Sequence, residues 1–241
     1  MYEPRFYHYW IKDKDLVSFK VIVKETELFV RAEKNLQKKC LKYVLKYREI
    51  IENYIRLNPI FLTTLEPYPN KKNVPSIIRD MILMSSIVNV GPMASVAGAI
   101  AEYVGKELIE YSPQIIIENG GDIFIKTNTE RLIGIYAGEK SPFTGKIALK
   151  IYPEETPLGI CTSSGTVGHS LSFGTADAVT VISKSAILAD AAATAVANIV
   201  KEKTDIDKAI EYSKGIKGIR GVVIIKDDKL ALYGDIEITN I

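Results

Sequence analysis

Residues 115–126 (IIIENGGDIFIK) and 185–200 (SAILADAAATAVANIV) determine the fold that the sequence predicts. The first stretch is an apolar run that stops at Glu118-Asn119-Gly120-Gly121-Asp122 and resumes at once, which indicates two strands joined by a sharp turn. The paired glycines lack Cβ atoms, so a backbone there can approach a ligand closely, and Asp122 adds an acceptor beside them. The alternative interpretation is a plain hairpin with Asp122 as an ordinary turn residue.

The second stretch predicts an Ala-rich helix whose apolar surface carries one carboxylate, Asp190, and one hydroxyl, Thr194, four residues later. This spacing places both oxygens on one helical face. A charged and a neutral oxygen are suitable ligands for Mg²⁺, which completes its coordination shell with water and phosphate oxygens. The alternative is that Asp190 pairs locally and Thr194 bonds back to a helix carbonyl.

The remaining elements occur in clusters of strands and helices, not in strict alternation, which predicts an α+β fold with a mixed antiparallel sheet and packed helices. A hairpin is expected around residues 25–27, and Asn35 is expected to cap a long helix. Pro-rich residues 60–74 predict an irregular connection. Further helices are expected at 76–89, 93–111, 185–200 and from Thr204, and further strands at 132–136, 146–152, 158–162 and 178–182 and in a closing hairpin around 227–228.

A third segment, residues 162–170 (TSSGTVGHS), gathers hydroxyls, two glycines and one of the two histidines of the chain. Such a loop can donate several hydrogen bonds to a phosphate or a ring. A loop that is simply flexible is the alternative. If the loop does bind a ligand, we expect it to converge with the Gly120–Asp122 turn and the start of the second helix. The candidate residues here are Ser163, Ser164, Gly165, His169 and Ser170.

Composition restricts the class of protein. The chain has 241 residues, of which 47% are hydrophobic and 25% charged, so it can bury a large core as one domain or two small ones. The net charge of +2 forms no basic stripe, which argues against a nucleic-acid partner. Two cysteines without a pair motif, no signal-peptide pattern and no uncharged run of membrane-spanning length predict a cytoplasmic protein without a membrane partner. The sequence leaves open whether the protein forms a homo-oligomer.

Four motifs in this chain resemble the ApbE superfamily, whose characterised members are magnesium-dependent flavin transferases. They are KETEL (24–28), GPMASVAGAIAE (91–102), ENGGD (118–122) and SSGTVGHS (163–170). Their wording is typical of a branch with no settled function, and the resemblance to that branch covers nearly the whole chain. It implies one ApbE-like domain over residues 1–241, built from two tunnelling-fold-like repeats with a boundary near residues 112–120.

The resemblance also assigns roles to residues. It implies that Asp190 and Thr194 hold magnesium against a flavin pyrophosphate, that Gly120, Gly121 and Asp122 lie against the flavin, and that His169 activates a target hydroxyl. It places Glu102 where transferases have a nucleotide-contacting Asp. Glu118-Asn119 is typical of the branch, and Glu118 could accept N–H groups of a heterocycle.

Three departures from the transferase pattern matter. Ala97 replaces a lysine, residues 171–174 replace an Asp-Pro motif, and no export signal is evident. The sequence therefore favours a magnesium-assisted site for FAD, FMN or a related nucleotide, with transfer of the FAD:protein FMN transferase type as one reaction. An enzyme or binding protein for a purine- or pterin-type phosphorylated heterocycle and a non-catalytic flavin binder are the alternatives.

Overall fold

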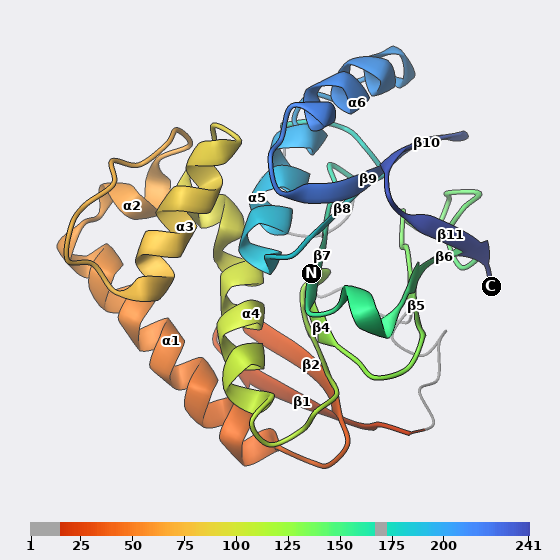
Figure 1. Ribbon diagram of the computed structural model, residues 1–241. Coiled ribbons are helices and arrows are strands. Elements are labelled where there is room, and N and C mark those ends of the chain that lie inside the picture. Colours follow the sequence, from red (N-terminus) through yellow and green to blue (C-terminus); the bar gives the residue numbers. More distant parts are fainter. Residues whose placement is uncertain (1–14, 167–172) are drawn as a thin grey trace.

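The computed structural model describes residues 15–166 and 173–241, which form three layers (Figure 1). An eight-stranded sheet lies in the middle, most of the helices cover one of its faces, and a three-stranded sheet covers the other. Every strand pair is antiparallel. The predicted α+β class with an antiparallel sheet is confirmed, whereas the two-repeat boundary near residues 112–120 stays a prediction.

The strands of the large sheet lie side by side in the order in which they occur in the chain, except that two strands between the fourth and the fifth of them belong to the small sheet. In spatial order they are β1 (Val17–Val23), β2 (Thr26–Ala32), β3 (Ile115–Asn119), β4 (Asp122–Lys126), β7 (Leu158–Ser163), β8 (Ala178–Ser183), β9 (Ile219–Lys226) and β10 (Lys229–Gly234). The small sheet has the order β11 (Glu237–Asn240), β6 (Ile147–Ile151), β5 (Arg131–Gly134).

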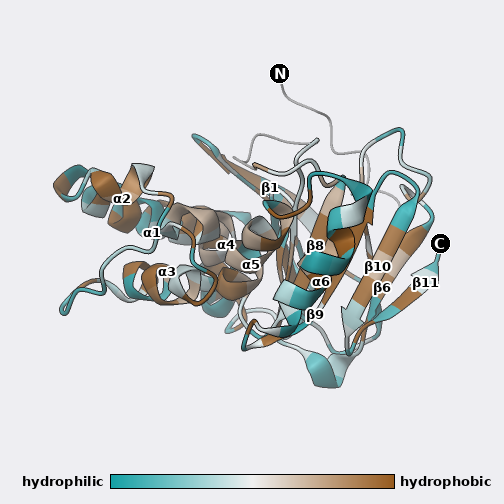
Figure 2. Cartoon of the chain, turned by 90° about the horizontal axis from the view of Figure 1, so that it is seen from above, coloured by the Kyte–Doolittle hydropathy of each residue, from teal (hydrophilic) through white to brown (hydrophobic). Residues whose placement is uncertain are grey.

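The helices come from two parts of the chain. The six α-helices of the described residues are α1 (Gln37–Leu57), α2 (Ile60–Thr63), α3 (Ser76–Ile87), α4 (Val96–Leu108), α5 (Ala186–Ala197) and α6 (Ile206–Lys214). The same described residues contain three short 3₁₀ turns, η2 (Pro92–Ser95), η3 (Pro153–Glu155) and η4 (Lys203–Asp205). Figure 2 shows α1 to α5 as a block on one side of the strands.

The pleat of the large sheet divides the core in two. In β3, the side chains of Ile115 and Ile117 pack against the helices, whereas Ile116 packs against the small sheet. Successive residues of a strand point to opposite faces, so this alternation assigns a face to every residue of the neighbouring strands.

Local predictions differ from the structure in three places. Helix α1 buries the predicted stripe Cys40, Val44, Tyr47, Ile51 and Tyr54, but its N-cap is Leu36, and the Asn35 side chain instead accepts a 2.9 Å hydrogen bond from the Gln37 amide. The connection expected to be irregular contains α2. Strand β11 was not expected, because only its long-range pairing with β6 defines it.

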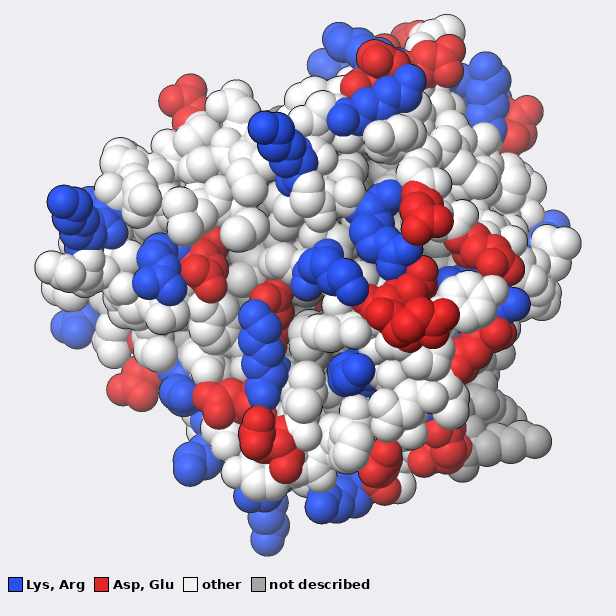
Figure 3. Space-filling model, viewed as in Figure 1, with Lys and Arg blue, Asp and Glu red and all other residues white. Residues whose placement is uncertain are grey.

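Charge and hydropathy agree with a globular domain. Lysines, arginines, aspartates and glutamates are interspersed over the face shown in Figure 3. Within the described residues, no single helix is both long and apolar enough to cross a membrane; α3 together with η2 and α4 reaches the length, but this pair is bent by 102°.

Candidate functional site

The turn between β3 and β4 forms as the paired glycines predict. Gly120 and Gly121 have φ angles of 75° and 110°, which match a two-residue type I′ hairpin turn. Asn119 and Asp122 face each other across it. Asn119 lies two residues after Ile117, and Asp122 two residues before Phe124. Since Ile117 and Phe124 face the helices, the side chains of Asn119 and Asp122 lie on the same helix-covered face of the sheet. The Asn119 amide donates to the Ala97 carbonyl at 3.1 Å, which ties the turn to the start of α4.

Asp190 lies on α5 and reaches the same place. Its Oδ2 accepts a 2.9 Å hydrogen bond from the Gly98 amide, in the first turn of α4, where backbone amides lack helical partners. Burial raises the pKa of Asp190 well above its usual value, and the negative charge of Asp122 acts in the same direction, while the amides of Gly98 and Ala97 partly oppose them. The charge of the half-buried Asp122 thus acts on the buried Asp190, which favours a cation or a proton near the two carboxyl groups.

Close backbone contact makes this arrangement possible. A Cβ at residue 98 would lie 2.2 Å from the Ala186 carbonyl oxygen and 2.9 Å from the Asp190 Cβ, so only glycine fits. Gly159 on β7 is equally close to Ala186, where a Cβ would lie 2.2 Å from its Cα. The start of helix α5 therefore packs closely against α4 on one side and β7 on the other.

The end of β7 adds two further groups on this face. Cys161 pairs with Asp122 in register, and its thiol donates to the Ala186 carbonyl at 3.3 Å. Burial, together with the charges of Asp122 and Asp190, raises the pKa of Cys161 well above its usual value. Ser163, two residues on, shares the face of Cys161; it is 6% exposed, and its Oγ has no hydrogen-bond partner in the part of the chain that the structure describes.

Ser163 lies on the stretch of β7 that runs alongside α5. Gly159 abuts Ala186 at the start of that helix, and Gly165 contacts Gly174, which in turn contacts Ala197 at the end. Strand β7 and helix α5 thus run in the same direction, so Ser163, which lies between Gly159 and Gly165, is level with a part of α5 between Ala186 and Ala197. A buried hydroxyl without a partner is uncommon in proteins and is often completed by a ligand or water.

The other candidates of the hydroxyl loop have varied surroundings. Ser164 Oγ receives the Thr166 amide at 3.1 Å, and the Gly165 amide donates to the Ala176 carbonyl at 2.9 Å, so both are tied into the loop. Thr194 is half-buried on α5. His169 and Ser170 lie outside the described residues.

Two predicted ligand residues lie where the resemblance did not suggest. Glu118 pairs with Ile123 and therefore lies on the face covered by the small sheet, opposite to Asn119 and Asp122. Glu102 is buried on α4, and its carboxylate accepts from the Ser185 hydroxyl at 2.9 Å and the Ile187 amide at 3.3 Å. It caps α5 in this structure.

The structure thus places Asn119, Asp122 and Ser163 on the helix-covered face of the large sheet, with the two glycines at the turn and Asp190 on a helix that covers this face. Among the described residues there is no group of three His, Cys, Asp or Glu side chains arranged to hold a metal ion. Magnesium commonly binds through only one or two carboxylates, with waters and substrate phosphates, so Asp190 and Asp122 with nearby hydroxyl and backbone oxygens fit that ion.

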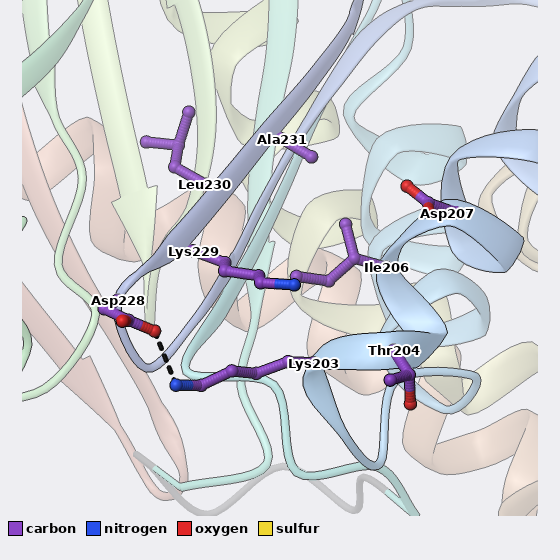
Figure 4. A pocket seen from close by; sticks show the side chains of 8 residues that line it. All are labelled: Lys203, Thr204, Ile206, Asp207, Asp228, Lys229, Leu230 and Ala231. Atoms are coloured by element: carbon purple, nitrogen blue, oxygen red, sulfur yellow. Dashed lines mark hydrogen bonds and ion pairs between the residues drawn. The ribbon is translucent and has the colours of Figure 1, made fainter.

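A groove of about 520 Å³ lies elsewhere, between η4, α6 and the β9–β10 hairpin (Figure 4). Its lining includes Lys203, which bonds Asp228 at 2.5 Å, and the side chain of Lys229. None of the predicted site residues lines it, and its charged groups are solvent-exposed, so the chemistry favours the α4–α5 site.

Comparison with known proteins supports the resemblance. A family model described as AbpE bacteria matches residues 8–232. The chain belongs to this family. A UPF0280 protein of Methanocaldococcus jannaschii is 44% identical over 223 residues, covering 90% of each chain. A UPF0280 protein of Archaeoglobus fulgidus is 39% identical over 224 residues, covering 90% of this chain and 92% of the relative.

Solved structures share the fold. The apo form of the flavinyl transferase ApbE from Pseudomonas stutzeri superposes with a TM-score of 0.57 over 90% of this chain and 94% of that chain, at 11% identity. The apbe protein of Thermotoga maritima gives a TM-score of 0.52 over 92% and 96%, also at 11% identity. The predicted ApbE-like fold is confirmed, and identity this low establishes the fold alone.

Sequence reasoning did not anticipate the position of Cys161 opposite Asp122 or the contact between Gly98 and Asp190. The position of Cys161 follows from strand alternation once the register is known, because it lies opposite Asp122. The sequence contains no signal for the Gly98 contact, since the two residues are 92 positions apart.

Proposed function

We propose that this protein binds a flavin nucleotide, FAD or FMN, together with magnesium at the site formed by the Gly120-Gly121 turn, the first turn of α4 and the middle of α5. One observation supports this most: the buried Asp190 carboxylate lies at the α4 N-terminus within the influence of a second carboxylate, Asp122, and the same face of the sheet carries Ser163, a buried hydroxyl that has no hydrogen-bond partner among the described residues. Groups of this kind are rarely retained in an interior unless a ligand completes them.

Magnesium would be held by Asp190, with Thr194 one turn later on the same helix. When bound, the ion neutralises phosphate charge and orients the nucleotide. The chain's own contribution is orientation, because the Gly98 amide fixes one oxygen of Asp190. Outer hydrogen bonds of this kind set the direction of a ligating carboxylate.

The flavin end of the nucleotide would lie at the glycine turn. Neither glycine carries a Cβ, and among the described residues a Cβ at Gly121 would meet only the Thr162 carbonyl oxygen, at 3.6 Å, which suits the approach of a flat ring. Ser163, Ser164, Gly165 and Ser170 are the proposed further contacts. The P. stutzeri protein of the same fold is a flavinyl transferase, which favours a flavin over other heterocycles.

The reaction is proposed to be transfer of FMN from FAD to a hydroxyl of a partner protein. His169 would take the hydroxyl proton, the hydroxyl oxygen would bond to the FMN phosphorus, and the pyrophosphate bond would break with AMP as the leaving group. Ala97 contributes no cation where transferases have lysine, which favours simple binding as the second candidate. The two candidates share the metal pair and the glycine turn and differ in whether a covalent product forms.

Titration calorimetry with FAD, FMN and GTP, each with and without Mg²⁺, tests the binding. We expect FAD or FMN to bind more tightly with Mg²⁺ present, and tight binding of GTP alone would favour the purine alternative. Incubation with FAD, Mg²⁺ and a cell extract separates the candidates. A fluorescent band that survives denaturation and disappears with His169→Ala indicates transfer, whereas release of all flavin on denaturation indicates binding only.

A further inference from the structure

Helices α4 and α5 each place a carboxylate at the N-terminus of the other. Asp190 of α5 accepts from the Gly98 amide in the first turn of α4 at 2.9 Å. Glu102 of α4 accepts from the Ile187 amide in the first turn of α5 at 3.3 Å, and from the hydroxyl of its N-cap, Ser185, at 2.9 Å. The two contacts run in opposite order along the helices, so α4 and α5 are antiparallel. Each helix thus stabilises the positive end of the other.

The Glu102 contact is a connected network. Ser185 Oγ donates to Glu102 Oε2 and accepts from the Leu188 amide at 3.4 Å. On its other oxygen, Glu102 receives the Lys106 ammonium at 2.5 Å. The Glu102 side chain is 5% exposed, whereas that of Lys106 is 57% exposed. The Ser185 hydroxyl and the Ile187 amide therefore bind the buried carboxylate of Glu102, while Lys106 neutralises its charge from the surface.

Close packing makes the two contacts interdependent. The missing side chain of Gly98 lets α4 lie directly on Ala186, one residue from the Glu102 contact at Ile187. Moving the start of α5 away from Glu102 would also shift Asp190, one turn further along, relative to the Gly98 amide. Rigid helices transmit such a shift because no loop intervenes between Ser185 and Asp190.

We infer that Glu102 is a positioning residue: it fixes the register of α5 on α4 and thereby aims the Asp190 carboxylate at the magnesium site. This role replaces the nucleotide contact that the resemblance implies for Glu102, because both of its oxygens already bind donors of the chain. The inference rests on the proposed function for its effect on ligand binding, but its structural part stands independently.

The structural part is tested by amide hydrogen exchange on the unliganded protein. In Glu102→Ala, exchange should accelerate at Ile187 and also at Gly98, because Asp190 loses its alignment. Glu102→Gln should protect both amides, because its amide oxygen still accepts from Ser185 and Ile187. Faster exchange confined to Ser185–Leu188 in Glu102→Ala would show a local cap only and would overturn the inference.

The functional part is tested by titrating Mg²⁺ alone, and then FAD with Mg²⁺, into the same proteins. Loss of a direct partner of a metal ligand typically lowers metal affinity about 10- to 100-fold. Glu102 acts on Asp190 through α5, so we expect a fall of about 10-fold for Glu102→Ala, with Glu102→Gln close to wild type. Unchanged Mg²⁺ affinity in Glu102→Ala, with FAD affinity lost in both variants, would instead assign Glu102 to the nucleotide and overturn positioning.

Asp80→Ala is the matched control. Asp80 on α3 accepts from the Tyr103 hydroxyl of α4 at 2.6 Å, so this variant removes a bond that holds α4 but none that holds α5. It should leave Mg²⁺ affinity unchanged at a comparable loss in Tm, and an equal loss of Mg²⁺ affinity would overturn the inference. A wild-type protein that binds neither Mg²⁺ nor flavin would refute the proposed function, while the exchange pattern would still decide on the helix register.

Discussion

Asp190 combines two properties that usually conflict. Its carboxylate is buried near Asp122, which disfavours the charged form, and yet it is directed to the helix amides that favour a negative charge. A bound cation resolves the conflict. In the unliganded chain the site is therefore expected to cost stability that ligand binding recovers, as is common for functional sites.

The first prediction concerns metal affinity. Asp190→Asn should weaken Mg²⁺ binding by more than the roughly 10- to 100-fold typical of losing an outer partner, because it removes the charged ligand. Thr194→Ala should weaken it less, since water can replace a hydroxyl. Calorimetry on the three proteins measures this, and equal affinities for wild type and Asp190→Asn would restrict the carboxylate to a structural role.

The second prediction concerns stability without metal. Because the pKa of Asp190 is raised in the folded chain, ionising it at neutral pH opposes folding. Asp190→Asn removes that cost and retains an acceptor for Gly98, so it should stabilise the metal-free protein by about 1 kcal/mol, or about 2–4 °C in Tm. Thermal unfolding in a chelator measures the shift. A clear fall in Tm would mean that the charged form supports the fold.

Sequence patterns predicted the individual groups better than their partners. The spacing of Asp190 and Thr194 on one face followed from helical periodicity, and the Gly120-Gly121 turn from its residue types. The sequence could also have predicted that Glu118 points to the opposite face from Asn119, because adjacent residues in a strand alternate between the two faces of the sheet. Partners such as Gly98 and Asp190 require the packing of distant helices, which local pattern does not encode.

At the scale of elements, the contact between α4 and α5 is the most demanding one in the site. It requires that Gly98 of α4 pack against Ala186 of α5, while Gly159 of β7 packs against Ala186 from the other side. The long helix α1 was predicted well because an apolar stripe of its own defines it. Strand β11 was missed because it has only four residues and no strong alternation.

The third prediction tests the α4–α5 contact. Gly98→Ala introduces a Cβ 2.2 Å from a backbone oxygen, so the helices must separate, and overpacking of this kind typically costs about 1–3 kcal/mol. Magnesium affinity should fall along with Tm. Gly215→Ala is the control, since its Cβ would be 3.4 Å from the Tyr212 oxygen at a φ of −79°. If both variants unfold at the wild-type temperature, the contact is less tight than described.

At the scale of the whole molecule, the order of the layers places the site on one face of the large sheet. The site lies on the helix side, whereas the small sheet closes the opposite side with its own apolar cluster. This division follows from strand alternation, but the assignment of β5, β6 and β11 to a separate layer does not. Short strands with similar composition fit either sheet until their pairing is known.

The fourth prediction concerns the join between layers. Asp15, just before β1, binds Arg131 of β5 through two hydrogen bonds of 2.8 and 2.6 Å. Chiefly through this bond, the pKa of Asp15 falls to about 2 from an ordinary value of 3.8. Because the pKa of Asp15 is lower in the folded than in the unfolded chain, its carboxylate stabilises the fold above about pH 4. This stabilisation is lost as the pH falls toward 2.

Asp15→Asn should accordingly lower Tm at neutral pH, with the difference from wild type narrowing below about pH 4 as both side chains become neutral. Thermal unfolding of the two proteins across that pH range measures it. Parallel curves at all pH values would show that the ion pair contributes nothing to folding.

A crystal structure of the protein with FAD and Mn²⁺, used in place of Mg²⁺ for its anomalous scattering, tests the central claim most directly. The account predicts an anomalous peak within coordination distance of the Asp190 carboxylate, with the nucleotide phosphates beside it and the ring at Gly120-Gly121. Metal and nucleotide found in the groove beside Lys203 and Lys229, or on the small-sheet side of the large sheet, would contradict it.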